Sequence, residues 1–108
     1  MAGLDHERLK AALALGRYEW RRHALERVDA RGIPHAAVLE TLASGTRIED
    51  YPDDQPHPSA LFLGGSGSQA LHVVAAMDAA ADWAYIITAY RPDRERFEDD
   101  LRTRRDRQ

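Results

Sequence analysis

Residues 70–90, with the sequence ALHVVAAMDAAADWAYIITAY, contain two apolar runs that are separated by the short segment DAAAD. The runs include valine, isoleucine, tyrosine and tryptophan, which are residue types that favour β-strands. A crossover between parallel strands needs about a dozen residues, so a connection as short as DAAAD predicts antiparallel neighbours. This predicted pair of strands decides the fold class.

Two further segments with strand-like composition precede this pair. They are TRIEDY at residues 46–51 and ALFLG at residues 60–64, and the turn-rich segment PDDQPHPS separates them. The glycine- and serine-rich segment GSGS then leads back to the apolar run that begins near residue 70. Because every connection is short, we expect the four strands to form an antiparallel meander over roughly residues 46–91.

Helical patterns lie on both sides of the predicted sheet. Residues 4–18 repeat leucine and alanine at helical spacing, residues 19–31 continue with a second helical run, and residues 34–44 begin with proline, which suits a first helical turn. Residues 93–108 predict a short C-terminal helix with a basic end. The sequence therefore predicts an α+β fold, with N-terminal helices, a four-stranded antiparallel β-meander and a short C-terminal helix.

Length and composition fit a single domain that spans residues 1–108. The chain is 44% hydrophobic, which is enough to fill one core, and it has no cysteine, which excludes disulfides and thiol chemistry. No segment has the apolar core of a signal peptide or approaches the roughly 20 apolar residues of a membrane span. We therefore expect a cytoplasmic protein with no membrane partner.

The overall charge of the chain is slightly acidic. A formal net charge of −3 argues against a surface that binds nucleic acid as a whole, because such surfaces carry an excess of lysine and arginine. It is compatible with a local basic patch.

The second helical run carries a basic stripe. His23, Arg27 and Arg31 follow one another at intervals of four residues, so they share one side of a helix, at the edge of the apolar face formed by Ala24 and Val28. One interpretation is a solvated helix side with Glu–Arg pairs. The other is a set of cations that reaches a cleft and holds a phosphate.

His72 occupies an unusual place for a titratable side chain, because it lies within an apolar strand. Strand alternation puts it on one face with small residues, whereas the other face holds the larger residues and is predicted to be the core face. His72 is then either a structural histidine that is hydrogen-bonded to a neighbour or a catalytic one beside a substrate. The residues predicted on the core face are Leu71, Val73, Ala75 and Met77.

The last predicted strand brings further polar groups to one face. Thr88 and Tyr90 alternate onto the same face, and Ile87 and Ala89 are expected on the other. Because the two strands are predicted neighbours, His72 is expected near Thr88 or Tyr90.

The segment TRIEDYPDD adds an acid and a phenol. Glu49 and Tyr51 share one face of the predicted strand, whereas Asp53 and Asp54 are interpreted as part of an acidic turn in water. Histidine and glutamate transfer protons and arginine neutralises charge that develops on a phosphate, so these residue types together suit phosphodiester cleavage.

The remaining histidines and glycines give no site. His6, His35 and His57 have no spacing typical of metal ligands, and we expect neither a metal nor another cofactor. The segment GGSGS joins two strands and is not followed by a helix, so it does not predict a phosphate-binding loop.

Several segments in a fixed order resemble the family known as domain of unknown function 4258. They are HALERVDARGI, IEDYPDDQPHPSALFLG, LHVVAAMD and IITAYRPDRERFEDD, and the resemblance covers residues 20–105. The helix motif of the family is similar to H-A-x-x-R-x-x-x-R-G-I. The positions that match its motifs are His23, Ala24, Arg27, Arg31, Gly32, Ile33, Glu49, Asp50, Tyr51, Pro52, Leu71, His72, Val73, Val74, Thr88, Ala89, Tyr90 and Pro92.

This resemblance implies a fold and an activity. Proteins of this kind are similar in fold to the RelE/barnase/EndoU/colicin (BECR) group of small metal-independent ribonucleases, many of which are toxins of toxin–antitoxin pairs. The resemblance implies an endoribonuclease with RNA as its substrate and an antitoxin or another protein as its partner. The expected catalytic residues are His72, His23, Tyr90 and Glu49, and the expected substrate-binding residues are Arg27, Arg31, Thr88 and Tyr51.

In the expected reaction, RNA lies across the sheet against the second helix. His72 or His23 takes the proton of a ribose 2′-hydroxyl, and the other protonates the leaving 5′-oxygen. Arg27 and Arg31 hold the phosphate, and the products are a 2′,3′-cyclic phosphate and a 5′-hydroxyl. The alternative is a non-catalytic protein-interaction domain of the same fold, which binds a protein partner through the sheet or the acidic segment EDYPDD, and the low net charge favours it.

Overall fold

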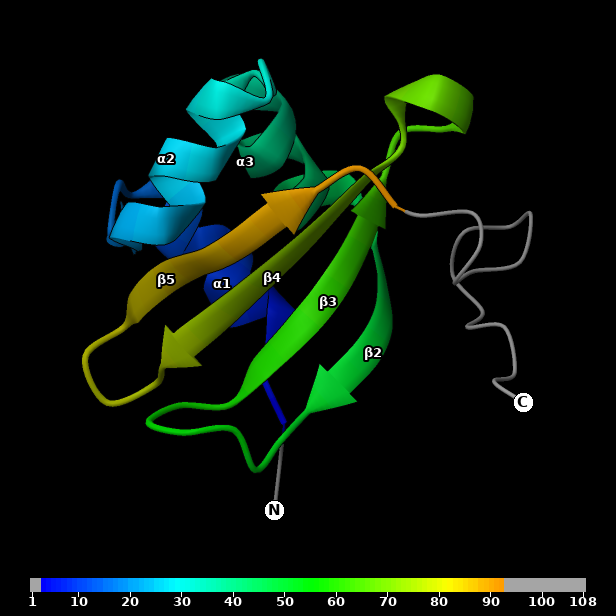
Figure 1. Ribbon diagram of the computed structural model, residues 1–108. Coiled ribbons are helices and arrows are strands. Elements are labelled where there is room, and N and C mark those ends of the chain that lie inside the picture. The colour runs from blue at the N-terminus through cyan, green and yellow to red at the C-terminus, as the bar shows by residue number, and fades with distance from the viewer. Residues whose placement is uncertain (1–2, 93–108) are drawn as a thin grey trace.

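The computed structural model describes residues 3–92 (Figure 1). Within these residues the chain forms three α-helices, five strands and one 3-10 turn. The helices are α1 (His6–Ala14), α2 (Arg22–Ala30) and α3 (His35–Ser44), and the turn is η1 (Gly67–Gln69). The strands are β1 (Tyr18–Trp20), β2 (Thr46–Tyr51), β3 (Ser59–Gly64), β4 (Leu71–Asp78) and β5 (Trp83–Tyr90).

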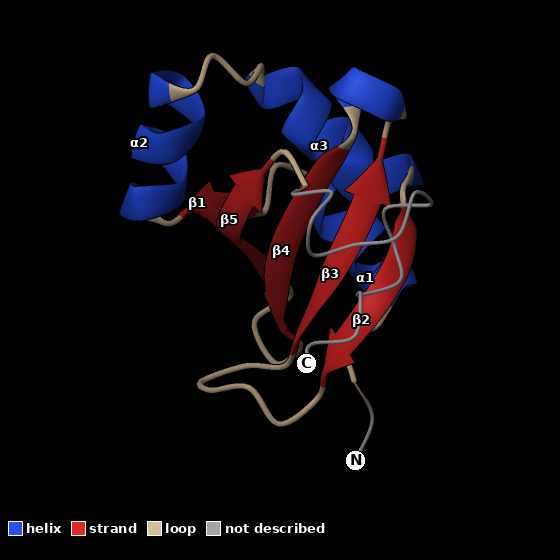
Figure 2. Cartoon of the chain, turned by 45° about the vertical axis from the view of Figure 1, so that its right-hand side comes forward, coloured by secondary structure: helices blue, strands red, loops and turns tan. Residues whose placement is uncertain are grey.

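The architecture is α+β, as the sequence predicted, and it has two layers. The strands form one sheet in the order β1-β5-β4-β3-β2, and α1, α2 and α3 cover one of its faces (Figure 2). The other face, which we call the open face, carries no helix within the described residues and faces the viewer in Figure 1. The predicted C-terminal helix at residues 93–108 lies outside the described part of the chain. None of the helices in the described ranges has the length and hydropathy needed to cross a bilayer.

The four predicted strands are present and pair antiparallel as β2-β3-β4-β5, but the sheet has a fifth strand and is therefore mixed. The added strand is β1, which pairs in parallel with β5. It begins at Tyr18, the end of the first predicted helical run, and includes Glu19 and Trp20 of the second run, residues 19–31, which was predicted to be helical. That prediction was wrong for the first residues because Arg21 is extended, with φ −66° and ψ 144°, and α2 begins only at Arg22. Three residues are too few for a period of two to be distinguished from one helical turn.

The helix-covered face of the sheet forms the core and confirms the predicted alternation in β4. The buried residues Ala24 and Val28 of α2 belong to this core. Burial of each large aliphatic side chain contributes about 1.5–3 kcal/mol to the free energy of folding. Gly32 follows α2 with a φ of +66°, a left-handed conformation that ends the helix. The core side chains from β3 and β4 are Ala60, Phe62, Leu71, Val73, Ala75 and Met77.

A β-bulge in β5 shifts which residues face the core. Val74 pairs with Thr88 and the next residue of β4, Ala75, pairs with Ile86, so Ile87 is the extra residue. The core side chains of this strand are therefore Ala84, Ile86 and Ala89, and the expectation that Ile87 shares the core face with Ala89 was wrong. Strict alternation fails here because a bulge changes the side-chain period by one residue.

The bulge also gathers polar and aromatic side chains on the open face. Four rows of facing residues lie on this face, and each row follows the strand register. The first row is Thr46, Leu63, His72 and Tyr90, the second is Glu49, Leu61, Val74 and Thr88, the third is Tyr51, Ser59, Ala76, Tyr85 and Glu19, and the fourth is Asp78 and Trp83.

Candidate functional site on the open face of the sheet

His72 and Tyr90 face each other across β4 and β5. They are register partners, and their ring centroids are 5.4 Å apart with an edge-to-face angle of 69°. The Nδ1 atom of His72 lies 3.4 Å from the hydroxyl oxygen of Tyr90, which is at the long end of the hydrogen-bond range. The sheet backbone therefore holds an imidazole beside a phenol at one end of the open face, as the sequence predicted for these strands.

The two rings differ in their access to solvent. The side chain of His72 is fully buried, with a relative exposure of 0%, whereas Tyr90 is half-buried. The phenol of Tyr90 is thus more accessible from solvent than the imidazole. His72 is suited to orient Tyr90 or to exchange a proton with it.

Thr88 lies on the same face, one row away from this pair. It pairs with Val74 and is half-buried, so its hydroxyl is on the side of the sheet where the sequence placed it. Glu49 and Tyr51 also lie on the open face, on the edge strand β2, and the hydroxyl of Tyr51 donates a hydrogen bond of 2.5 Å to Oε1 of Glu49. Glu49 is two strands and one row from His72, which places their Cα atoms about 12 Å apart.

The basic stripe of α2 is spread along one side of the sheet. The guanidinium of Arg31 donates to the carbonyl oxygen of Ala89 at 3.4 Å, which places this arginine at the end of β5 next to Tyr90. His23 begins the helix, with its side chain 82% exposed and its Nδ1 3.8 Å from Oε1 of Glu26. Eight residues separate it from Arg31, which corresponds to about 12 Å along a helix.

The structure therefore places Arg31 at the end of β5 that carries Tyr90, whereas His23 lies at the opposite end of α2. Arg27 lies between the two ends of the stripe and is exposed. A second cation at the His72 end was missed from the sequence. Arg91 donates to the carbonyl oxygens of Gln69 and Ala70, at 3.0 and 3.3 Å.

The other end of the open face holds a second cluster, which the sequence interpretation also missed. The ring of Tyr85 is stacked with that of His57 at 5.7 Å between centroids and 3° between planes, and the guanidinium of Arg21 lies 4.7 Å from the centroid of Tyr85. Strict alternation from Thr88 and Tyr90 would have placed Tyr85 on the core face, and only the bulge at Ile87 brings it to the open face. Nothing in the sequence indicates that His57, in the loop between β2 and β3, reaches it.

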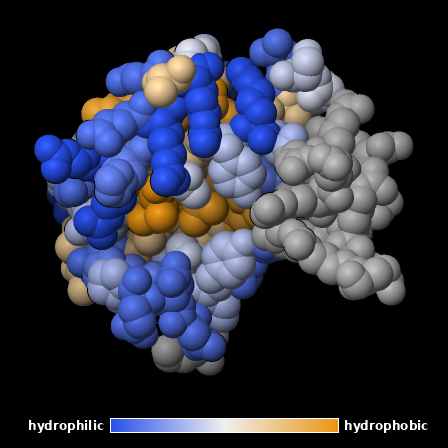
Figure 3. Space-filling model, viewed as in Figure 1, coloured by the Kyte–Doolittle hydropathy of each residue, from blue (hydrophilic) through white to orange (hydrophobic). Residues whose placement is uncertain are grey.

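The surface of the open face matches this division. Figure 3 shows hydrophobic side chains over the middle of the sheet, with hydrophilic side chains around them. Of the apolar residues of the second row, which lie between the two polar ends, Val74 is half-buried and Leu61 is fully buried. The open face is thus an apolar strip with polar and aromatic groups at both ends.

The other histidines have structural contacts. His6 lies with Nε2 2.7 Å from the carbonyl oxygen of Leu42, and its ring packs 4.6 Å from that of Phe62 on the helix side. His35 lies 2.7 Å from a carboxylate oxygen of Asp29. Within residues 3–92, no three histidine, aspartate or glutamate side chains are grouped so that they would hold a metal ion.

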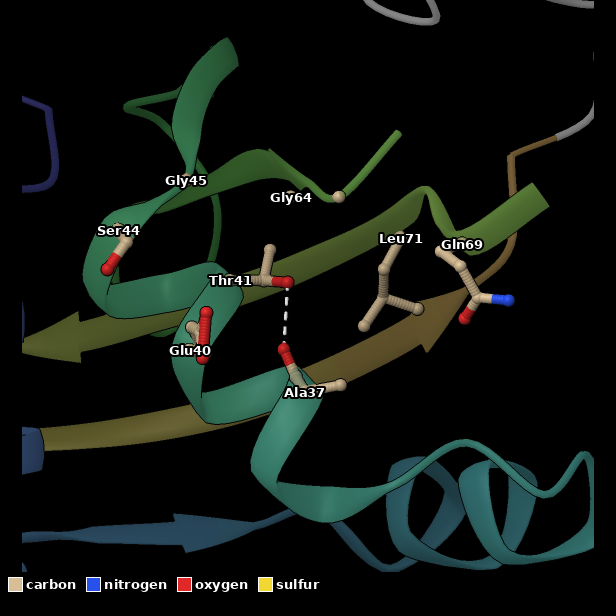
Figure 4. Close-up of a pocket in the computed structure, with 9 residues that line it drawn as sticks. Ala37, Glu40, Thr41, Ser44, Gly45, Gly64, Gln69 and Leu71 are labelled. Carbon is tan, nitrogen blue, oxygen red and sulfur yellow. Dashed lines mark hydrogen bonds between the residues drawn. The ribbon is translucent and has the colours of Figure 1, made fainter. Parts of the chain in front are cut away.

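A pocket on the helix side lies beside a place where α3 and β3 pack closely. It lies between α3 and the ends of β3 and β4, and Figure 4 shows Thr41 at its wall with a hydrogen bond from its hydroxyl to the carbonyl oxygen of Ala37, 2.8 Å long. A Cβ atom on Gly64 would lie 2.4 Å from the Thr41 hydroxyl oxygen, so the strand approaches the helix only because residue 64 is a glycine. The lining holds no buried charged group, and we assign it no ligand.

Comparison with protein families identifies the chain. The family described as "Domain of unknown function (DUF4258)" matches residues 20–91. The chain belongs to the DUF4258 family. The DUF4258 match begins at Trp20 and ends at Arg91, so it includes α2, α3 and the four antiparallel strands, with both ends of the open face. No curated protein and no solved structure matches the chain significantly.

Proposed function

We propose that this DUF4258 protein is a metal-independent endoribonuclease with a fold of the BECR type. The observation that carries the proposal is the pairing of His72 with Tyr90 on the open face, with Arg31 at the same end of β5. An imidazole and a phenol supply proton transfer, and a guanidinium neutralises the charge that develops on a phosphate.

In the proposed reaction Tyr90 contacts the RNA and His72 acts behind it. The phenol oxygen of Tyr90 takes the proton of a ribose 2′-hydroxyl as its own proton passes to the imidazole. The 2′-oxygen then forms a bond to phosphorus, the bond from phosphorus to the 5′-oxygen breaks, and the 5′-oxygen takes a proton from water. The products are a 2′,3′-cyclic phosphate and a 5′-hydroxyl.

The other predicted residues take supporting roles in this proposal. Arg31 holds the phosphate at the end of β5, and Thr88 contacts the RNA beside Tyr90. Arg27 extends the basic side of α2 away from Arg31, with the exposed His23 near the start of the helix. Their exposure suits electrostatic attraction of RNA more than contact with the reacting atoms.

Glu49 and Tyr51 form a hydrogen-bonded pair on β2, on the far side of the apolar strip. We propose that they bind a neighbouring nucleotide. The family resemblance supports a toxin role in the cytoplasm with an antitoxin as partner.

The proposal is tested by cleavage in the presence of a chelator. Purified protein is incubated with RNA in EDTA, and the new ends are mapped for cyclic phosphates and 5′-hydroxyls. Tyr90→Phe and His72→Gln are expected to lose most of the activity, and His35→Gln is a matched control because His35 lies away from the open face, beside Asp29. RNA that stays intact with the wild-type chain, or a His72→Gln variant as active as wild type, would contradict the proposal.

A second candidate function is a non-catalytic protein-interaction domain. The complete burial of His72 favours it, because a buried imidazole also suits a purely structural role, and so does the formal net charge of −3. Growth after induced expression separates the two functions. If the protein is a toxin, expression of the wild-type chain arrests growth and expression of Tyr90→Phe does not. If it is an interaction domain, cells that express either chain grow equally.

A further inference from the structure

The Tyr85 end of the open face has an arrangement that the proposed reaction does not use. Tyr85 lies in the third row, beside Ala76 on β4 and Glu19 on β1. Its half-buried ring contacts the guanidinium of Arg21 at 4.7 Å and the ring of His57 at 5.7 Å. Guanidinium and aromatic planes attract each other over such distances, so these groups fix the orientation of Tyr85.

The position of His57 is fixed by Asp78 of β4. Its Nε2 atom lies 3.7 Å from Oδ2 of Asp78, and Oδ1 of the same carboxylate accepts from the backbone N–H groups of Ala80 and Ala81. The loop that carries His57 is tied to the sheet as well, because the hydroxyl of Ser59 donates to Asp54 at 2.7 Å. The stacked pair of rings is therefore preorganised.

Trp83 adds a third ring to the same face, two residues before Tyr85 on β5. Its indole N–H donates to Oε1 of Glu19 at 3.0 Å, and the guanidinium of Arg17 lies 5.8 Å from its ring. Trp83 is half-buried, so part of the ring is accessible. The hydrogen bond from the indole engages the carboxylate of Glu19, and the register partner of Trp83 on β4 is Asp78.

We propose that Trp83, Tyr85 and His57 form a surface that stacks the bases of single-stranded RNA, with Arg21 at a phosphate. We call these four residues the aromatic platform. Fixed aromatic rings on a sheet, flanked by arginine, are the means by which proteins bind unpaired nucleotides, since every base has a π-face. Bases inside an A-form duplex are stacked on each other, so the platform selects single strands.

The position of the platform relates it to the cleaved bond, and in this respect the inference rests on the proposed function. Tyr85 is beside Ala76, four residues along β4 from His72, which is about 13 Å in an extended strand. The platform therefore does not touch the reacting phosphate. It binds bases a few nucleotides away and determines that the substrate is an unpaired stretch of several nucleotides.

Binding is measured with a single-stranded oligonucleotide whose 2′-hydroxyls are methylated, so that it is not cleaved. The chain has two tryptophans, Trp20 and Trp83, and the full-length Trp20→Phe variant therefore reports on the platform alone. We expect this oligonucleotide to quench the fluorescence of Trp83, and we expect a duplex of the same sequence to bind much more weakly.

Substitutions then locate the contact. Tyr85→Ala is expected to weaken binding about 5- to 150-fold, as loss of one stacked base does, and Tyr85→Phe is expected to bind as wild type. Arg21→Ala is expected to weaken binding and to reduce its salt dependence by about one phosphate contact. The matched control is Arg22→Ala, because Arg22 lies beside Glu26 and its side chain is 86% exposed.

Three results would overturn the platform: unchanged Trp83 fluorescence at saturation, duplex binding as tight as single-strand binding, or an Arg21→Ala variant that binds like Arg22→Ala. The last comparison decides the matter even where Tyr85→Ala fails to fold. The outcome is separable from that of the proposed function. RNA cleavage with the same KM in wild type and Tyr85→Ala contradicts the platform only, whereas quenching of Trp83 without any cleavage contradicts the ribonuclease only.

Discussion

The two faces of this sheet are built by different rules. On the helix-covered face, apolar side chains alternate along β4 and pack against three helices, and each is nearly or fully buried. On the open face, the same strands carry histidine, tyrosine, threonine and glutamate at both ends of an apolar strip. The comparison indicates that the side chains of the core and the side chains of the proposed reaction lie on opposite faces of the same strands. Substitutions should therefore divide into two classes according to the face.

The largest expected effect is on the open face. Tyr90→Phe removes the hydroxyl that lies 3.4 Å from the imidazole and keeps the half-buried ring. Because general acid–base groups contribute typically ~10²–10⁴-fold to rate, we expect RNA cleavage to fall by a factor in this range, with little change in the free energy of unfolding. Cleavage rates and urea denaturation of the same preparations check this. A variant that loses stability in proportion to activity would remove the distinction between the faces.

The next effect is on the helix-covered face. Phe62 is fully buried in the core, and its ring also contacts His6. Phe62→Ala is expected to lower the free energy of unfolding by about 3–5 kcal/mol, because it removes buried surface and leaves a cavity. Chemical denaturation measures the change. Stability within 1 kcal/mol of wild type would show that this side is not the core that the packing indicates.

A smaller effect is expected where β3 approaches α3. In Gly64→Ala the new Cβ would lie 2.4 Å from the hydroxyl oxygen of Thr41, so helix and strand must move apart, and we expect a loss of about 1–3 kcal/mol. The double variant Gly64→Ala with Thr41→Ala removes the contacted hydroxyl. It should recover part of the loss in the same thermal or urea unfolding assay, and a double variant that is less stable than the sum of both changes would contradict the clash.

The smallest effect concerns the first helix. The side chain of Asp5 accepts hydrogen bonds from the backbone N–H groups of Glu7 and Arg8, so it caps the N-terminus of α1. Asp5→Ala should lower stability by about 1 kcal/mol and leave any cleavage unchanged. Asp5→Ser, which keeps a capping oxygen, should be close to wild type when both are compared by unfolding.

The sequence predicted those parts of the fold that repeat along a segment. Alternation in residues 70–78 placed Leu71 and Val73 in the core and His72 on the other face, and the short turns predicted antiparallel pairing. Parts that depend on a single residue or on a distant contact were not predictable in this way. β1 has only three residues, which is too short for a period of two to be recognised. The bulge at Ile87 interrupts the alternation from which the two faces of β5 are predicted.

The candidate site was predictable only where its residues lie on neighbouring strands. His72 and Tyr90 meet because two adjacent strands have a fixed register, and the sequence contains that information. His23 was placed with them on the strength of a shared helix side, but a stripe of three residues spans about 12 Å of helix and reaches different parts of a surface. His57 approaches Tyr85 and Asp78 from a loop, and the course of such a loop has no periodic signal.

The parallel pairing of β1 with β5 has a consequence for the order in which the chain folds. Tyr18 meets Ala84, so residues 21–82, about two-thirds of the described chain, lie between the two strands, and their ends must be brought together against an unfavourable loop-closure entropy. The hairpin-linked strands β3, β4 and β5 close only short loops and are expected to form early. β1 therefore docks late, after the central strands are in place, and it is the strand whose local opening requires the least unfolding of the rest.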